Sequence, residues 1–268
     1  MKRPSSTGWR EASDTAFQFA IENRAEIARR IVDIDTYLPD ARPLTFFMAG
    51  SPGAGKTEVS LNMISLLEKS QNKNRPITSA PFRILRIDPD EIRESMPGYL
   101  GGNAEVFQRG VTKIVERVVD RAFSKSISFL LDGTFSNKEV AMRNVDRALK
   151  RGRLVDVLFV YQEPGATWRL IKEREEITGR SIPFDAFLRH VIQSRQTVAF
   201  VKEKYGDSIN LSVFISNESA FSPEFAVSLD AFDRLVPDHY DEDRLRQLIL
   251  DSKEGDCDAE ASPGRSFP

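Results

Sequence analysis

Short apolar segments alternate with longer segments of helical periodicity along the middle of the chain. The apolar segments predict strands over 44–49, 83–87, 127–131, 154–161 and 209–215. The segments between them repeat apolar residues every three or four positions and predict helices over 56–68, 106–123, 137–150, 166–178 and 184–204. Strands that alternate with helices favour a mostly parallel central sheet flanked by helices, so the pattern predicts an α/β fold.

The two ends of the chain follow other patterns. Residues 1–13 are polar and we expect them to be loosely ordered, whereas residues 14–32 place apolar side chains at helical spacing. This spacing predicts an amphipathic helix that packs on the core, with a docking surface for a partner as the alternative. Towards the C-terminus we expect a small strand near Ala226 and a helix from Asp241. Residues 252–268 are small and polar, which is typical of a disordered tail.

The first predicted strand leads into a glycine-rich loop that fits the pattern G-x-x-x-x-G-K-[ST]. The loop consists of Gly50, Ser51, Pro52, Gly53, Ala54, Gly55, Lys56 and Thr57. Its glycines allow positive φ angles, so that successive N–H groups face phosphate oxygens. Lys56 then reaches the β- and γ-phosphates, and the Thr57 hydroxyl is placed to bind Mg2+. A helix that begins here points its positive end at the same anion, so the sequence predicts binding of ATP or GTP.

Carboxylates follow the second predicted strand. Asp88 is a candidate N-cap, Pro89 suits the first helical position, and Glu91 is spaced as the returning carboxylate of a capping box. Capping does not require Asp90. We expect its carboxylate to project from the C-terminal edge of the sheet, where α/β proteins bind their ligands.

The third predicted strand ends in Asp132, Gly133 and Thr134. An aspartate at the end of an apolar strand is typical of the Walker B position, whose carboxylate helps to hold Mg2+. Gly133 has no side chain to activate water, which favours phosphoryl transfer to another acceptor over hydrolysis. The alternative role of Asp132 and Thr134 is a capped turn into the next helix.

Cationic side chains gather on one short predicted helix and its exit loop. They are Arg169, Lys172, Arg174 and Arg180, and Gly179 is the expected end of the helix. In many P-loop kinases a segment in this place is a lid that closes arginines over the transferring phosphoryl group. We therefore expect a lid around 164–183, with Arg174 and Arg180 preferred. The alternative is a solvated face on which neighbouring glutamates neutralise these charges.

Composition narrows the class of protein. The chain has 268 residues, enough for one sizeable core, and 38 Lys and Arg balance 40 Asp and Glu, so we expect neither nucleic acid nor membrane as a partner. The one cysteine, Cys257, excludes an intrachain disulfide and a cysteine-based metal site. Polar residues follow the basic start where a signal peptide needs apolar ones, and no run has the length of a membrane span. A cytoplasmic protein is expected.

These motifs together resemble those of the zeta-toxin family of P-loop kinases, whose characterised members phosphorylate UDP-N-acetylglucosamine on the sugar. The resemblance spans roughly residues 40–205 and rests on segments 50–57, 87–93, 96–97, 131–134, 174 and 179–183. It implies a P-loop NTPase fold of the kinase type, with a core over 40–216 between an N-terminal extension (1–39) and a C-terminal elaboration (217–251).

The resemblance also implies roles for single residues. Asp90 corresponds to the general base, and Lys56, Arg174 and Arg180 correspond to phosphate contacts. Asp132 and Thr134 correspond to the acceptor site, to which we also assign Asp88 and Arg93. Some members of the family have an antitoxin protein that blocks the ATP site. The chain departs from the family pattern at Met96, where a histidine is common, and at Asp132, where a glutamate is common, so other nucleotide-bearing acceptors stay open.

The expected function is therefore transfer of the ATP γ-phosphate, with Mg2+, to a hydroxyl of a small nucleotide-sugar acceptor, in a toxic or a metabolic role. One alternative is a kinase for another acceptor, either an NAD-like dinucleotide or the end of a polynucleotide. Another is an ATP-binding regulatory module without catalysis. A GTPase-like switch is disfavoured, because residues 137–140 fail the Asn-Lys-x-Asp motif at the last position.

Overall fold

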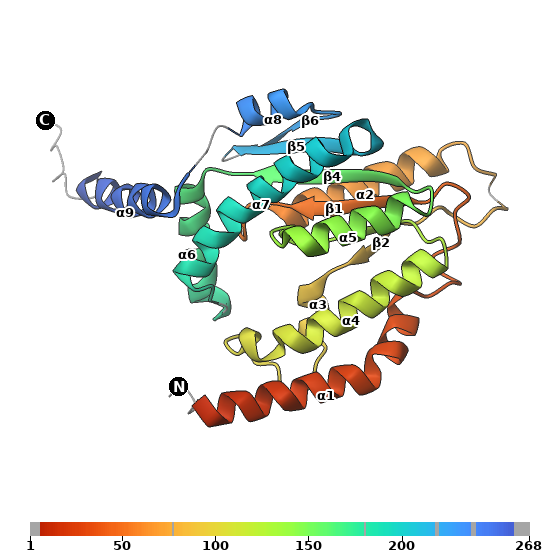
Figure 1. Cartoon of the computed structure of the whole chain (residues 1–268), viewed down its shortest axis with the longest axis horizontal. Helices are drawn as coiled ribbons and strands as arrows, with labels where there is room; N and C mark the ends of the chain where they lie inside the picture. The colour runs from red at the N-terminus through yellow and green to blue at the C-terminus, as the bar shows by residue number, and fades with distance from the viewer. Residues whose placement is uncertain (1–5, 77, 180, 218–219, 237–239, 260–268) are drawn as a thin grey trace, which may run out of the picture.

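The computed structural model describes residues 6–76, 78–179, 181–217, 220–236 and 240–259. Its centre is a six-stranded sheet of order β2-β3-β1-β4-β5-β6 (Figure 1). The strands are β1 (Leu44–Ala49), β2 (Leu85–Ile87), β3 (Phe129–Leu131), β4 (Leu154–Tyr161), β5 (Asn210–Asn217) and β6 (Ala220–Glu224). Neighbouring strands are parallel except β5 and β6, which are antiparallel. The predicted α/β fold with a mostly parallel sheet is confirmed.

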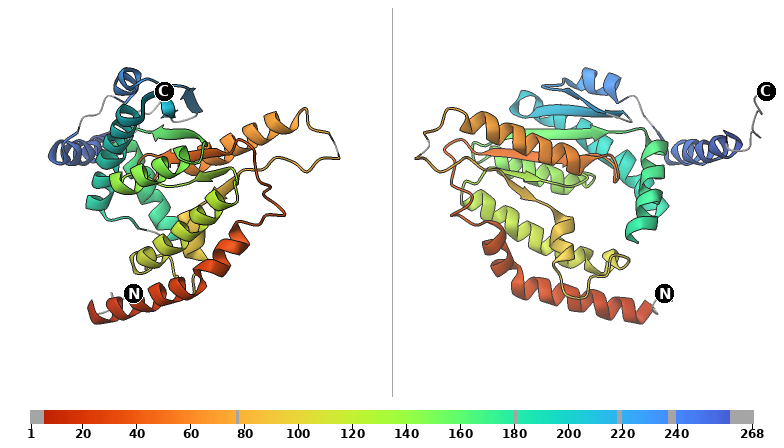
Figure 2. Two further views of the ribbon diagram at one scale, coloured as in Figure 1. Left: turned by 45° about the vertical axis from the view of Figure 1, so that its right-hand side comes forward. Right: turned by 180° about the vertical axis from the view of Figure 1, so that it is seen from behind.

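Helices cover both faces of this sheet (Figure 2). They are α1 (Ser6–Ile31), α2 (Lys56–Asn72), α3 (Pro89–Glu94), α4 (Ala104–Ser124), α5 (Lys138–Leu149), α6 (Pro164–Thr178), α7 (Phe184–Tyr205), α8 (Leu229–Leu235) and α9 (Glu242–Ala259), with a 3-10 turn at Gly206–Ser208. Helices α4, α5, α7 and α8 pack on one face, and α2 packs on the other. None of the helices in the described ranges is long and apolar enough to cross a membrane.

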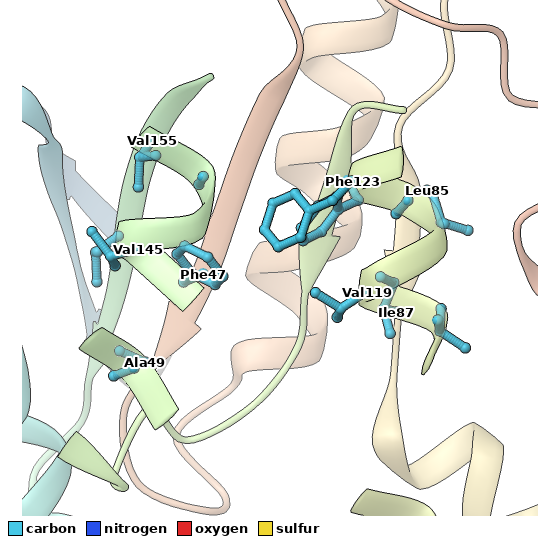
Figure 3. Close-up of a cluster of buried hydrophobic side chains, with 14 of the residues drawn as sticks. Phe47, Ala49, Leu85, Ile87, Val119, Phe123, Val145 and Val155 are labelled. Carbon is cyan, nitrogen blue, oxygen red and sulfur yellow. The ribbon is translucent and has the colours of Figure 1, made fainter. Parts of the chain in front are cut away.

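The alternation of side chains along β1 divides the core between the two faces. Phe47 and Ala49 point to the face that α4 and α5 cover, where they join Leu85, Val119 and Val145 (Figure 3). Phe46 and Met48 point to the opposite face. Both sets are 7% exposed or less, so β1 is buried on both sides, as expected for a central parallel strand. A rigid central strand fixes the loop that follows it.

Two predicted strands are shorter in the structure than in the sequence pattern. The second was predicted from residue 83 and the third from residue 127, but β2 begins at Leu85 and β3 at Phe129. Ile84 explains part of the difference, because its N–H donates to the Glu68 side chain at 2.8 Å instead of to a neighbouring strand. A hydrogen bond to a side chain of α2 thus replaces pairing with a neighbouring strand at this edge of the sheet.

The ends of the chain differ more from the expectation. Residues 6–13, predicted as loosely ordered, belong to α1, which packs along α4 as the amphipathic helix was predicted to do. The strand expected near Ala226 lies at Ala220–Glu224, because Ala226 has a φ of 53° and turns the chain. Residues 252–259, predicted as disordered, are helical in α9, and residues 260–268 lie outside the described ranges. Strand β6 joins the central sheet, so the sheet crosses the expected boundary at residue 216.

Candidate active site

The loop between β1 and α2 has the geometry of a phosphate cradle. Gly50, Gly53 and Gly55 have φ angles of 129°, 82° and 85°. A Cβ atom at Gly50 would lie 2.3 Å from the Val160 carbonyl oxygen, so the loop approaches β4 more closely than any side chain allows. The loop ends where α2 begins at Lys56, so an anion bound in the loop would meet both its N–H groups and the N-terminus of the helix.

Lys56 lies deep in the loop with part of its surface on the adjoining cleft. Its ammonium donates to the carbonyl oxygens of Gly50 at 3.2 Å and Ser51 at 2.6 Å. Burial lowers its pKa to about 8, although the carboxylates of Asp132 and Asp90 oppose the shift. A cation so poorly solvated gains from a polyphosphate beside it, so the residues present fit a nucleotide triphosphate.

The loop opens onto a cleft of about 2070 Å3. The predicted site residues that line it include Lys56, Thr57, Asp88, Asp90, Arg93, Asp132, Thr134 and Arg174. Ser51 and Ala54 of the same loop are buried and do not line the cleft, and Arg180 lies outside the described residues. A pocket for one ligand usually measures ~300–1,000 Å3, so this cleft has room for a nucleotide and a second small molecule.

Asp88 and Asp90 have different surroundings although they are two residues apart. Asp88 is the N-cap of α3, as predicted, and accepts from the Asp90 N–H at 2.8 Å. Asp90 is 43% exposed and pairs with the Arg93 guanidinium, which is only 9% exposed. Arg93 also donates to Gln108 Oε1 at 3.1 Å, while Glu91 pairs with Arg86 at 2.6 Å instead of closing a capping box. Asp90 is thus held in place while its carboxylate faces the cleft.

Asp132 is buried at the end of β3. Its Oδ2 accepts from Arg86 at 2.5 Å and from the Ser60 hydroxyl at 3.3 Å. Burial is the main cause of the raised pKa of Asp132, and the Arg86 guanidinium opposes it. One of the two Asp132 oxygens is therefore already occupied by a cation, which leaves Asp132 a weaker candidate for a metal ligand than the strand motif predicts.

The residues present fit a magnesium ion that a nucleotide and the protein would hold together. In the part of the chain that the structure describes, no group of three or more His, Cys, Asp or Glu side chains is arranged to hold a metal. Mg2+ commonly keeps several waters and binds one or two protein groups plus substrate phosphates. Thr57 is exposed at the first turn of α2 and lines the cleft, so its hydroxyl remains available to such a complex.

The segment after Asp132 crosses from β3 to the far wall of the cleft. Thr134 Oγ1 lies 2.9 Å from Ser136 Oγ, which in turn lies 3.0 Å from His190 Nδ1. The Thr134 carbonyl accepts from the Gly50 N–H at 3.2 Å. The sequence carries no local signal for a role of Ser136 and His190, because 54 positions separate them and neither belongs to a motif.

Helix α6 forms the wall opposite α3, in the place predicted for the lid. Arg169 and Arg174 are exposed and line the cleft, and Lys172 pairs with Glu175 at 2.7 Å. The helix ends at Gly179 with a φ of 69°, as predicted. Ile171 packs towards the loop, since a Cβ atom at Gly53 would lie 2.8 Å from its side chain. The helix thus brings arginine side chains to the cleft and also supports the phosphate-binding loop.

Comparison with solved structures shows the same fold in other proteins. One is described as the PezAT chromosomal toxin-antitoxin system of Streptococcus pneumoniae, with a TM-score of 0.58 and 18% identity over 94% of this chain and 97% of that chain. Another is an AvrRxo1-ORF1:-ORF2 complex with ATP, with a TM-score of 0.55 and 15% identity over 85% of this chain and 71% of that chain. A comparison with curated protein sequences gave no match.

The sequence itself matches a family. The profile described as Zeta toxin covers residues 28–221, which include both walls of the cleft, the phosphate-binding loop and the whole sheet except most of β6. The match extends over more than two thirds of the chain, and the fold agrees with it. The chain therefore belongs to the zeta toxin family.

Proposed function

We propose that this protein is an ATP-dependent kinase that transfers the γ-phosphoryl group to a hydroxyl of a small nucleotide-sugar acceptor, of which UDP-N-acetylglucosamine is the model. The observation that carries the proposal is that one cleft is lined both by Lys56 of the phosphate cradle and by the half-exposed Asp90 of α3. An ATP-bound relative of the same fold and membership of the zeta toxin family support it.

In the proposed reaction, each residue acts at a stated atom. The acceptor oxygen forms a bond to the γ-phosphorus while the bond from that phosphorus to the β,γ-bridging oxygen breaks, and ADP leaves. Asp90 takes the proton of the acceptor hydroxyl, and Arg93 holds the Asp90 carboxylate in position. Lys56 and the loop N–H groups bind the phosphates, and Arg174 and Arg180 offset the charge that develops in transfer. Mg2+, when bound beside Thr57, supplies further neutralisation of phosphate charge.

The proposal is tested by Asp90→Asn. We expect the variant to bind ATP as the wild type does and to lose phosphoryl transfer by on the order of 10²–10⁴-fold, because a base has been removed and the binding loop has not. Glu94→Gln, on the exposed side of the same short helix, is the matched control. The measurement is mass spectrometry of a small-metabolite extract incubated with ATP and Mg2+, with UDP-N-acetylglucosamine and NAD also tested singly. Undiminished turnover in Asp90→Asn would remove Asp90 from the mechanism.

We also propose an antitoxin partner. The similar structure from Streptococcus pneumoniae is described as a toxin-antitoxin system, and the AvrRxo1-ORF1 structure as a complex with AvrRxo1-ORF2. We expect the untagged product of an adjacent reading frame to co-purify with the tagged kinase. We also expect it to suppress ATP binding by the kinase.

A further inference from the structure

The segment from Thr134 to Ser136 has an unusual backbone. Phe135, between them, has a φ of 55°, a conformation that aromatic residues rarely adopt. This turn folds the chain so that the two flanking hydroxyl oxygens lie 2.9 Å apart. Backbone strain of this kind persists only where the surroundings hold it, and such positions gather at functional sites.

Contacts on three sides hold this turn. The Phe135 ring packs on Phe47 of β1 with centroids 5.8 Å apart. The Thr134 carbonyl accepts from the Gly50 N–H at 3.2 Å, and the Ser136 carbonyl accepts from the Thr197 hydroxyl at 3.3 Å. The turn is therefore fixed both to the phosphate-binding loop and to α7.

His190 completes a chain of hydrogen bonds that runs from α7 to the cleft. Its Nδ1 lies 3.0 Å from Ser136 Oγ, and Ser136 Oγ lies 2.9 Å from Thr134 Oγ1. Burial, with the charges of Lys56 and Arg189, lowers the pKa of His190, so the imidazole is neutral at pH 7. The neutral ring either accepts a hydrogen bond from the Ser136 hydroxyl or donates one to it. The direction of this bond then sets whether Ser136 accepts from Thr134 or donates to it. Thr134, at the end of the chain, lines the cleft.

The face of α7 that lines the cleft has a different chemistry from the phosphate cradle, and Lys138 and Glu139 of α5 line the cleft beside it. The residues of α7 that line the cleft are Ala186, His190, Gln193, Gln196, Thr197 and Phe200, and with a neutral His190 none of them carries a charge. Lys138 of α5 is stacked over the Phe200 ring, with its ammonium 3.3 Å from the ring centroid. Amide and hydroxyl groups match the donors and acceptors of a polyhydroxyl ring, whereas cations in the cradle and on α6 match phosphates.

We infer that Ser136 and His190 are positioning residues that orient the Thr134 hydroxyl towards a neutral, hydroxyl-bearing ring of the phosphoryl acceptor. The inference rests on the proposed kinase function and adds to it the acceptor wall of α7. Ser136 and His190 act through Thr134, so their loss impairs the hold on the acceptor and leaves the ATP site intact.

Kinetics with a small-metabolite extract test this role whatever the identity of the acceptor. The rate of γ-phosphate incorporation from ATP is measured over a dilution series of extract, which separates the half-saturating extract concentration from the maximal rate. We expect Ser136→Ala and His190→Leu to raise the half-saturating concentration on the order of five- to tenfold, because one hydrogen bond of the chain is lost. The KM for ATP is expected to be unchanged. Ser124→Ala, at the exposed end of α4, is the matched serine control.

Conservative variants distinguish positioning from mere support of the fold. Ser136→Thr keeps the hydroxyl, and His190→Asn keeps a hydrogen-bonding atom at the place of Nδ1, so both are expected to restore most of the affinity for the acceptor. If these variants are as impaired as Ser136→Ala and His190→Leu, or if the latter two match the wild type, the inference is wrong. Incorporation that is absent even in the wild type would instead overturn the proposed function, and the inference with it.

A spectroscopic signature tests the chain without turnover. The protein has two histidines, His190 and His239, so 15N spectra of the full, histidine-labelled chain contain two imidazoles, which His190→Asn assigns. We expect the wild type to hold His190 in one tautomer and Ser136→Ala to return it to a mixture. An imidazole that is tautomerically mixed in the wild type and unaffected by Ser136→Ala would contradict the hydrogen-bonded chain.

Discussion

Arg86 of β2 contacts three carboxylates at the ends of β2 and β3 and on α3. It pairs with Asp88 at 2.6 Å, Glu91 at 2.6 Å and Asp132 at 2.5 Å, and its Nε donates to Ser60 at 3.1 Å. Its side chain is 11% exposed, and that of Asp132 is 8% exposed. The charge of one arginine thus compensates the buried carboxylate of Asp132 and the partly buried carboxylate of Asp88, and it holds the ends of β2 and β3 together.

We expect Arg86→Met to be strongly destabilising. The variant leaves Asp132 and Asp88 without their cation, and breaking a buried pair by removal of one partner costs about 3–5 kcal/mol. The double variant Arg86→Met with Asp132→Asn should recover part of this loss, because the uncompensated charge at Asp132 is gone. Urea unfolding measures both effects. Lys113→Met, which removes an exposed pair with Glu116, is the control and should change the free energy of unfolding by about 0.5 kcal/mol or less. If Arg86→Met and Lys113→Met lower the free energy of unfolding by the same amount, this role of Arg86 is contradicted.

Asp156 on β4 predicts a pH dependence of stability. Burial raises its pKa from 3.8 to about 6, although hydrogen bonds from Ser212 and the charge of Lys202 oppose the shift. The folded state binds the proton of the Asp156 carboxyl more tightly than the unfolded state does. The contribution of this carboxyl to the free energy of unfolding is therefore stabilising below about pH 4 and is lost as the pH rises through about 6. Asp156→Asn removes the charge and keeps an acceptor for the Ser212 hydroxyl.

The variant should therefore match the wild type near pH 4 and exceed it near pH 8. Because the pKa is raised by about two units, the free energies of unfolding of variant and wild type should differ by up to about 3 kcal/mol at the higher pH. Thermal melts across this pH range measure the difference, and Asp207→Asn, a fully exposed aspartate, is the control. A constant difference between Asp156→Asn and the wild type from pH 4 to pH 8 would show that the carboxyl does not titrate in this window.

Among the elements, α1 and α4 pack so closely along each other that a glycine is needed between them. A Cβ atom at Gly110 of α4 would lie 2.9 Å from the Ala16 carbonyl oxygen and 3.2 Å from the Ala20 Cβ, both on α1. Helix α4 also carries Gln108, which contacts Arg93, the partner of Asp90. The N-terminal helix therefore supports the wall of the cleft from behind, although it contributes no residue to the lining.

Gly110→Leu should force the two helices apart. Overpacking of a tight contact costs typically ~1–3 kcal/mol, and the displacement of α4 should lower phosphoryl transfer more than ATP binding, because Asp90 depends on α4 and the phosphate-binding loop does not. Circular dichroism melts and the KM for ATP check the two parts. Gly133→Ala, where a new Cβ would meet no atom within 4 Å, serves as the control for stability. A Gly110→Leu variant as stable and active as the wild type would show that the packing of α1 on α4 tolerates a larger separation.

Across the whole molecule, the features predicted from sequence were those carried by consecutive residues. The phosphate-binding loop, the Asp88 cap and the Gly179 helix end each depend on neighbours within a few positions, so local patterns define them. Arg86 was visible only as a strand residue, because its partner Asp132 lies 46 positions away. The ion pairs of Arg86 and the hydrogen bonds from His190 to Thr134 form where separate strands and helices meet. A single sequence carries no signal of which distant residues meet.

The C-terminal helix is also connected to the phosphate-binding loop through packing that the sequence did not indicate. Leu245 and Ile249 of α9 are buried against Trp168, Ile171 and Phe187 of α6 and α7. Ile171 in turn packs towards Gly53 of the loop. Residues more than 190 positions apart thus act on the same loop, with α6 as the intermediate.

This connection predicts that Leu245→Ala alters the loop from a distance. The variant opens a cavity beside Trp168, which is 3% exposed. A buried Leu→Ala change costs about 2–5 kcal/mol, and here it weakens the packing of α9 on α6. In a Trp9→Phe background, where Trp168 is the one remaining tryptophan, we expect its fluorescence to shift to longer wavelength and the KM for ATP to rise. Leu250→Ala on the same helix removes a side chain that is 44% exposed and should change neither quantity. If Leu245→Ala shifts the fluorescence but leaves the KM for ATP unchanged, α9 stabilises α6 without acting on the loop.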